Sequence, residues 1–305
     1  MKILVIGAGG VGGYYGGMLA RAGHDVFFIA RGYHLEALKK NGLTVKSFSG
    51  DFNAKVKCGH RAESFGVADL VLVCVKSYDT VTSLGLYRAN VGPETVILSL
   101  QNGIDNEKLI AEEYGRERVM GGIAFIGTRV SEPGVILHTA FGHVTIGEFD
   151  KTITDRAKRM GAMFEEAGVK CKISGDIWRD MLGKMVWNVG FNAICAILDC
   201  PAKESVSFPD TREIVKSAMT EWIYVTRAMG TPLDFDLADK NIEVTLKGSE
   251  VIPSMLHDRR LSRQMEIDTF NGKVVELGEG LKVDTPVNRT ITAMVRFLNN
   301  QRNQP

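Results

Sequence analysis

Apolar residues near the start of the chain follow two successive spacings. The run "KILVI", Lys2–Ile6, is too short for a helix and stops at Gly7, so it predicts a buried strand. The next segment, "GYYGGMLARAG", repeats its apolar residues at intervals of three and four and ends at Gly23, which predicts a capped helix. The run "DVFFIAR" then predicts a second strand. Strand, helix and strand within about 30 residues indicate a βαβ unit with parallel strands.

The same alternation continues along the first half of the chain. A helix is expected at "LEALKKNG", a pair of strands through "LTVKSF" and "FNAKVKC", and two fully buried strands at "DLVLVCVK" and "ETVILSLQNG". Residues 119–148 are rich in Val, Ile, Thr and Gly around the turn "SEPG", which predicts an antiparallel addition. A helix over residues 153–167 and the strand "VKCKIS" close this part. We therefore expect a first α/β domain over residues 1–175.

Strand patterns disappear after this point. Runs such as "TREIVKSAMTEWIYVTRAMG" and "DTPVNRTITAMVRFLNN" place apolar residues three and four apart, with Gly230 as a stop signal and Pro286 near a helix start. The length of 305 residues suits two domains. We therefore expect residues 176–305 to form a mainly α-helical second domain.

Composition narrows the class of partner and the compartment. The chain is 45% hydrophobic with a net charge of +1, so nothing draws it generally to nucleic acid or membrane. The many glycines of the first 23 residues are poor for the helical core of a signal peptide, which predicts a cytoplasmic protein. The five cysteines form no C-x-x-C pair and no metal-ligand spacing with histidine. We expect reduced core thiols and no metal site.

The glycines after the first strand predict a cofactor. Gly7, Gly9 and Gly12 form G-x-G-x-x-G between a strand and its helix. In that context the first glycine makes a tight turn, the second lets the backbone approach a pyrophosphate, and the third allows close packing of the helix. The amino end of the helix offers free N–H groups to the phosphates. We therefore expect a Rossmann domain that binds a dinucleotide.

Two basic residues at strand ends favour NADP(H) over NAD(H). An NAD site usually has Asp or Glu at the end of the second strand, whereas this chain has Ala30 and Arg31 and no acid before Glu36. The planar guanidinium of arginine suits a 2′-phosphate. Lys76 ends the later strand "LVLVCVK" and should lie at the same edge of the sheet. Alone, either residue is equally well read as a solvated strand end.

A polar stripe interrupts the otherwise apolar helix "GKMVWNVGFN". Lys184, Asn188 and Asn192 are four residues apart, so they drift only about 40° per step and share one helix face. Such a stripe predicts the wall of a cleft between the domains. Lys184 suits the protonation of a developing alkoxide in a carbonyl reduction. A surface lysine with two mobile asparagines is the alternative.

These motifs together resemble the ketopantoate reductase (2-dehydropantoate 2-reductase) family over essentially the whole chain. The resemblance is carried by "GAGGVG", "CVKSYDT", "LQNG", "GKMVWNVGFN" and "PSMLHDRRLSRQMEIDTFNG". It implies NADPH-dependent reduction of ketopantoate to D-pantoate in pantothenate and coenzyme A synthesis, with Lys184 as general acid and Glu266 orienting Lys184 or a substrate hydroxyl. It further implies that Asn188, Asn192 and Ser254 bind substrate and that Asn102 lies near the nicotinamide ribose or substrate.

One departure from the family pattern leaves the substrate open. The family commonly has an asparagine after "CP", whereas this chain has Ala202 after Cys200 and Pro201. Alanine has neither the donor nor the acceptor of an amide. A different 2-keto acid is therefore one alternative to ketopantoate. The helical domain offers apolar surface for a homodimer, although no single stripe stands out.

Two other classes of protein compete with this interpretation. A β-hydroxyacid dehydrogenase would share K-x-x-x-N, but its motif has glycines four and seven residues before the lysine, where this chain has Asp180 and Ile177. An NADPH-sensing protein without chemistry would have no reason to keep Lys184 and Glu266 together.

Overall fold

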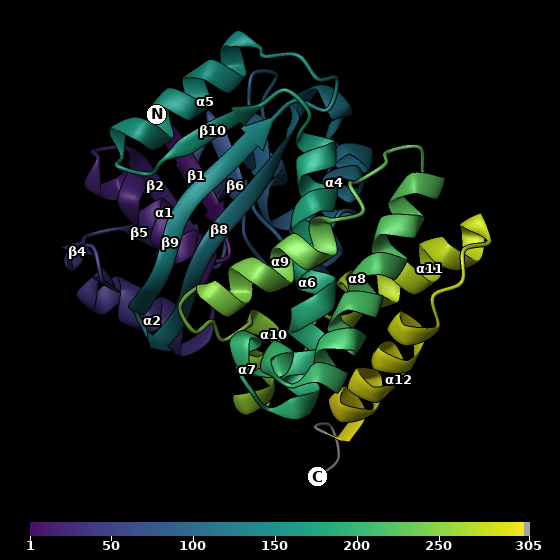
Figure 1. Cartoon of the computed structure of the whole chain (residues 1–305). Coiled ribbons are helices and arrows are strands. Elements are labelled where there is room, and N and C mark those ends of the chain that lie inside the picture. Colours follow the sequence, from purple (N-terminus) through teal and green to yellow (C-terminus); the bar gives the residue numbers. More distant parts are fainter. Residues whose placement is uncertain (302–305) are drawn as a thin grey trace. The chain divides into compact units, whose positions relative to one another are not determined.

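The computed structural model describes residues 1–301 of the chain. It divides into two compact units, the first covering Met1–Trp178 and the second beginning at Arg179. The division falls inside one long helix, after its second residue. The first unit is a mixed sheet with helices and the second is helical (Figure 1), which confirms the predicted fold class.

The first unit is built on a 10-stranded sheet in the order β4-β3-β9-β8-β7-β6-β1-β2-β5, with β10 paired to β9. Strands β5, β2, β1, β6, β7 and β8 are mutually parallel, whereas β8 and β9 form a long antiparallel hairpin. The strands are β1 (Lys2–Ile6), β2 (Asp25–Ile29), β3 (Leu43–Ser47), β4 (Phe52–Ala54), β5 (Lys57–Gly59), β6 (Leu70–Val73), β7 (Val96–Ser99), β8 (Val119–Glu132), β9 (Val135–Gly147) and β10 (Cys171–Ser174).

Helical segments connect these strands. The α-helices are α1 (Gly10–Arg21), α2 (Gly32–Asn41), α3 (Thr80–Ser83), α4 (Asn106–Tyr114) and α5 (Asp155–Glu166). The 3-10 turns are η1 (Glu63–Phe65), η2 (Ser77–Asp79), η3 (Leu84–Asn90) and η4 (Arg116–Arg118). The βαβ unit and the antiparallel addition are both present, as the spacing of apolar residues predicted.

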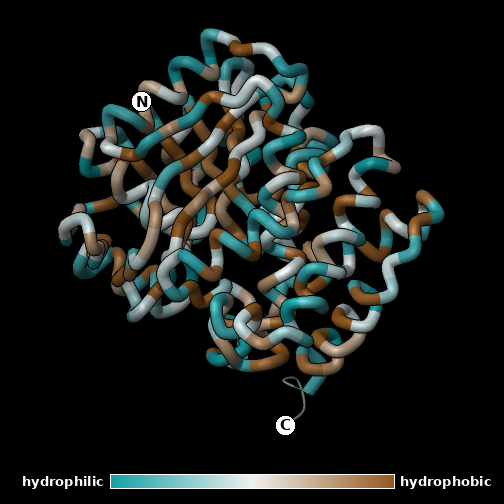
Figure 2. The backbone as a smooth tube through the Cα atoms, viewed as in Figure 1, coloured by the Kyte–Doolittle hydropathy of each residue, from teal (hydrophilic) through white to brown (hydrophobic). Residues whose placement is uncertain are grey.

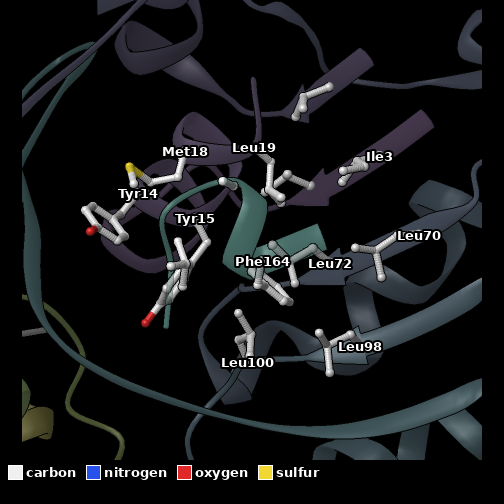
Figure 3. Packing of buried hydrophobic residues seen from close by; sticks show 14 of the residues in the cluster. Ile3, Tyr14, Tyr15, Met18, Leu19, Leu70, Leu72, Leu98, Leu100 and Phe164 are labelled. Atoms are coloured by element: carbon white, nitrogen blue, oxygen red, sulfur yellow. The ribbon is translucent and has the colours of Figure 1, made fainter. Parts of the chain in front are cut away.

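The central strands are buried on both faces, which explains their continuous apolar runs. On one face, Leu70, Leu72 and Leu98 lie near Phe164 of α5 (Figure 3). The rings of Tyr15 and Phe164 meet edge to face at 6.3 Å and join α1 to α5. A second cluster, which includes Leu4, Val71, Ile97, Tyr87 and Ile110, covers the other face. Figure 2 shows the hydrophobic residues concentrated along these strands.

One predicted strand is divided in the structure. The segment "FNAKVKC" forms two strands of three residues each, β4 and β5. They lie at opposite ends of the sheet, since β4 pairs with β3 and β5 pairs with β2. The polar residues between the apolar ones do not fix a register by alternation alone, so the segment could not be assigned to one partner from its pattern.

The second unit consists of helices around α6. Its elements are α6 (Ile177–Leu198), α7 (Ala202–Ser207), α8 (Pro209–Ala228), α9 (Leu237–Lys247), α10 (Ser254–Arg260), the turn η5 (Ile267–Thr269), α11 (Asn271–Leu281) and α12 (Pro286–Gln301). The indole nitrogen of Trp222 in α8 donates to the Leu182 carbonyl at 3.0 Å. The amide of Asn271 in α11 donates to the Val189 carbonyl at 3.0 Å. Hydrogen bonds from two helices therefore reach the backbone of α6.

Helix α6 is long and apolar enough to cross a membrane by length and composition. Most of its apolar window is buried inside the protein, and Leu182, Val186 and Phe191 are fully buried. This is the burial expected for the core helix of a helical domain.

Candidate active site

The glycine loop follows β1 at the carboxyl edge of the sheet. Gly7 has φ +96°, and a Cβ there would lie 2.9 Å from Val75. A Cβ on Gly12 would lie 2.1 Å from the Gly7 carbonyl oxygen. These two glycines are required by the turn and by the close approach of α1. Gly9 differs, because a Cβ there would meet nothing within 4 Å. Its backbone is therefore open to a ligand.

The loop lies at a reversal point of the sheet. β1 pairs in parallel with β2 on one side and with β6 on the other. The carboxyl ends of all three strands therefore meet at one edge, where ligands of open α/β sheets bind. Gly9 is the N-cap of α1 and has no side chain to occupy the first amide groups. Those N–H groups suit a pyrophosphate.

Arg31 and Lys76 occupy the flanking strand ends. Arg31 follows β2 as the N-cap of α2, and Lys76 follows β6 as the N-cap of η2. Nη2 of Arg31 forms an ion pair with Oδ2 of Asp79 at 2.9 Å. The ion pair joins the loop of Arg31 to the turn that Lys76 precedes. Sequence reasoning missed Asp79, although an acid three residues after Lys76 was visible in "CVKSYDT".

Asn102 follows β7, and a buried polar network fixes its loop. The Asn102 carbonyl accepts from Nδ2 of Asn106 at 2.8 Å. Oδ1 of Asn106 accepts from Oγ1 of Thr80 at 2.8 Å. Nε2 of Gln101 donates to Thr80 at 2.7 Å and to the Val75 carbonyl at 3.0 Å. The network ties the loop that carries Lys76 to the loop that carries Asn102, and none of its three buried side chains was singled out from sequence.

Glu107 lies beside this network in the first turn of α4. Its side chain is 2% exposed, and neither carboxyl oxygen has a hydrogen-bond partner of good geometry. Burial raises the pKa of Glu107 to about 7, and the nearby hydroxyl of Ser99 opposes the rise. Burial outweighs the opposing effects of the Glu107 backbone N–H and of Ser99 on this pKa. The carboxyl is therefore partly protonated at neutral pH.

Within the second unit, α6 presents the predicted polar stripe to α10. Nδ2 of Asn192 donates to Oδ1 of Asn188 at 3.1 Å. Oδ1 of Asn192 accepts from Oγ of Ser254 at 3.1 Å and from the backbone N–H of Met255 at 3.2 Å. The structure therefore brings Asn188, Asn192 and Ser254 together. Asn192 is 1% exposed and acts as the joint between the two helices.

Lys184 and Glu266 lie close enough for their charges to interact. Lys184 keeps a small part of its surface exposed, while Glu266 is 5% exposed just before η5. Burial lowers the pKa of Lys184 to about 8, and the charge of Glu266 opposes this shift. A lysine with a pKa in this range can give up and regain a proton near neutral pH. Lys184 is therefore suited to acid–base chemistry, at a position on α6 four residues before Asn188.

Ala202 begins α7 and is fully buried. Its backbone N–H donates to the Val251 carbonyl at 2.9 Å, three residues before Ser254. The position where the family pattern has an amide thus adjoins the segment that leads into α10. It contributes a methyl group there in place of a polar side chain.

Both halves of the chain match models of one known family. Residues 3–151 match the model described as ketopantoate reductase PanE/ApbA, and residues 176–299 match its C-terminal model. A curated 2-dehydropantoate 2-reductase of Archaeoglobus fulgidus is 34% identical over 298 residues, covering 97% of each chain.

Solved structures give the same picture. A 2-dehydropantoate 2-reductase from Geobacter metallireducens GS-15 is similar with a TM-score of 0.92 and 36% identity, covering 99% of each chain. A D-mandelate dehydrogenase structure with NADH and anilino(oxo)acetate has a TM-score of 0.93 at 23% identity, covering 100% of each chain. At that identity the second likeness shows the fold alone.

Proposed function

Because this chain belongs to the ketopantoate reductase family, we propose that it reduces 2-dehydropantoate to D-pantoate with NADPH. It is an oxidoreductase that acts on CH–OH groups. The observation that carries the proposal is the interaction of Lys184 with the charge of Glu266, at a position on α6 four residues before Asn188. A buried lysine with a pKa of about 8 is costly for a structural role and useful for a proton donor.

The first unit fits a nicotinamide dinucleotide. The open space above Gly9 and the uncapped first turn of α1 accommodate a pyrophosphate. Arg31 and Lys76 supply positive charge for the 2′-phosphate of NADP(H), and Asn102 serves the nicotinamide ribose or the substrate. When bound, the reduced nicotinamide supplies the hydride that the 2-keto carbon requires.

Lys184 is the proton donor of this proposal. As the keto oxygen gains negative charge, the ammonium at Nζ first stabilises that charge and then transfers a proton to it. Burial makes the ammonium a stronger acid than an exposed lysine, because the neutral amine needs no solvation. Glu266 keeps the pKa from falling further and so preserves the charged form near neutral pH.

Asn188, Asn192 and Ser254 form the substrate-binding surface. Amide and hydroxyl groups can hold the carboxylate and hydroxyl of a 2-keto acid without adding net charge. Since Oδ1 of Asn188 accepts from Asn192, the Nδ2 group of Asn188 is its donor for a substrate. Asn192 holds this donor and Ser254 at fixed positions.

A direct assay tests the proposal. NADPH oxidation is followed with ketopantoate, pyruvate, 2-ketoisovalerate and benzoylformate, for the wild type and Lys184→Gln. We expect ketopantoate to have the highest kcat/KM and the variant to lose at least about 100-fold. If another 2-keto acid has the highest kcat/KM, that acid replaces ketopantoate as the proposed substrate. This alternative arises from Ala202, which is buried where the family pattern has an asparagine. NADPH binding without turnover of any acid would favour a sensor instead.

The biological setting is part of the same proposal. The product would enter pantothenate and coenzyme A synthesis in the cytoplasm. Its partner is a small 2-keto acid, and a homodimer is compatible with the exposed apolar residues of the second unit, such as Phe297 and Met294.

A further inference from the structure

The ion pair between Arg31 and Asp79 joins two strand ends that are not neighbours in the sheet. Arg31 follows β2 and Asp79 ends the turn η2 beyond β6, with β1 between those strands. The pair therefore spans the carboxyl end of β1, where the glycine loop begins. It lies within the site assigned above to the dinucleotide, so a role for the pair in cofactor choice rests on the proposed function.

The pair is weakly held and easily rearranged. The Arg31 side chain is 85% exposed and the Asp79 side chain is 29% exposed. Ion pairs in such surroundings contribute little to stability, because water screens both charges and the arginine loses freedom on pairing. A ligand that binds the Arg31 guanidinium more tightly than Asp79 does can displace the Asp79 carboxylate.

The two nicotinamide cofactors would meet this carboxylate differently. A 2′-phosphate on Arg31 would bring negative charge beside Asp79 and compete with it for the same guanidinium. A ribose 2′-hydroxyl carries no charge and can donate to a carboxylate, as it does in NAD sites. Asp79 thus opposes the phosphate and tolerates or binds the hydroxyl.

We propose that Asp79 is a cofactor-specificity residue that lowers the preference for NADPH over NADH by competing with the 2′-phosphate for Arg31. Arg31 binds the 2′-phosphate of NADPH, and its ion pair with Asp79 limits the affinity for NADPH that Arg31 provides. The ratio of the two affinities is therefore set by the pair and not by Arg31 alone.

The test measures the dissociation constants of NADPH and NADH by calorimetry at fixed ionic strength. Asp79→Asn should raise the NADPH/NADH affinity ratio about three- to tenfold, as expected for removal of one nearby like charge. Asp79→Glu keeps the charge and should stay within about twofold of the wild type. Asp25→Asn is the matched control, because it removes the exposed Lys57–Asp25 pair of 2.7 Å at the opposite end of β2.

Each result decides between the alternatives. A ratio that is unchanged or falls in Asp79→Asn overturns the inference, as does an equal rise in Asp79→Glu or Asp25→Asn. These results leave the proposed cofactor site intact if Arg31→Ala still lowers the ratio. A wild type that binds neither cofactor, or an Arg31→Ala variant with an unchanged ratio, refutes the cofactor assignment and the inference with it.

Discussion

Asn192 donates a hydrogen bond to Asn188 one turn earlier on α6, while its own carbonyl oxygen accepts two hydrogen bonds from the first turn of α10. The two asparagines therefore make different contacts, although their spacing in the sequence places them alike on one helix face. Asn192 joins the helices, whereas Asn188 contributes its Oδ1 as the acceptor for Asn192, and the substrate contact proposed for Asn188 is left to its Nδ2 group.

Asn192→Ala should weaken both the fold and substrate binding. It leaves the buried N–H of Met255 without its acceptor, which costs about 1 to 3 kcal/mol of unfolding free energy. It also releases Asn188 and Ser254, so the KM for the keto acid should rise. Asn188→Ala should raise KM with a much smaller loss of stability. Thermal unfolding and steady-state kinetics on both variants check this, and equal losses of stability would contradict the division of roles.

The reductase activity should fall as the pH rises through about 8. The pKa of Lys184 is lowered to about 8, so the protonated donor is present below this pH and lost above it. Oxidation of the hydroxy acid needs the neutral amine and should show the opposite dependence. The measurement is kcat/KM in both directions between pH 6 and 10. Parallel profiles in the two directions would exclude Lys184 as the group that titrates.

Glu266→Gln should move the alkaline limit of reduction to lower pH. The charge of Glu266 raises the pKa of Lys184 against the effect of burial, and glutamine removes that charge at nearly constant size. A pH profile of kcat/KM for the variant beside the wild type provides the comparison. If kcat/KM is lower at every pH but its alkaline fall stays at the same pH, Glu266 acts on the substrate and not on the lysine.

Arg31→Ala should lower the affinity for NADPH about 10-fold or more, because one charge-assisted contact of about 1.5 to 3 kcal/mol is lost. NADH should change little, since it has no 2′-phosphate. Arg61 provides a control, as an exposed arginine of the same unit that pairs with Glu63. Binding titrations with both cofactors separate the two effects. Equal weakening of NADPH and NADH would indicate a general loss of charge and not recognition of the phosphate.

Glu107→Gln should stabilise the protein above neutral pH. The folded pKa of about 7 exceeds the ordinary 4.5, so the wild type loses stability as the pH rises from about 4.5 to about 7. The difference in unfolding free energy between variant and wild type should therefore grow by about 2 to 3 kcal/mol between pH 4.5 and 8. Glu112→Gln, on an exposed position of α4, is the control. Thermal unfolding at both pH values decides, and a difference independent of pH would contradict the shifted pKa.

Much of this molecule is readable from local pattern. The Gly7 turn, the βαβ unit and the Lys184 stripe each arise from short-range spacing, and spacing is present in the sequence. Contacts between residues far apart in the sequence could not be predicted from these local patterns. Asp79 meets Arg31 across 48 positions, and Gln101 meets Thr80 across 21. Such contacts depend on the order of the strands in the sheet, and the separation of β4 from β5 shows that this order is not encoded in one segment.

The edge strands of the sheet also bear on the tendency of the protein to aggregate. The strands at both ends of the main strand order, β4 and β5, are only three residues long, and β10 beside β9 has four. Lys55, Lys57 and Lys172 lie in or next to these strands. Short margins with charged residues offer little template to the backbone of another chain, which is how natural sheets avoid edge-to-edge aggregation. Within the strand order, β9 has partners on both sides, whereas β8 pairs with β7 at Val119 and Met120 and with β9 along most of its length.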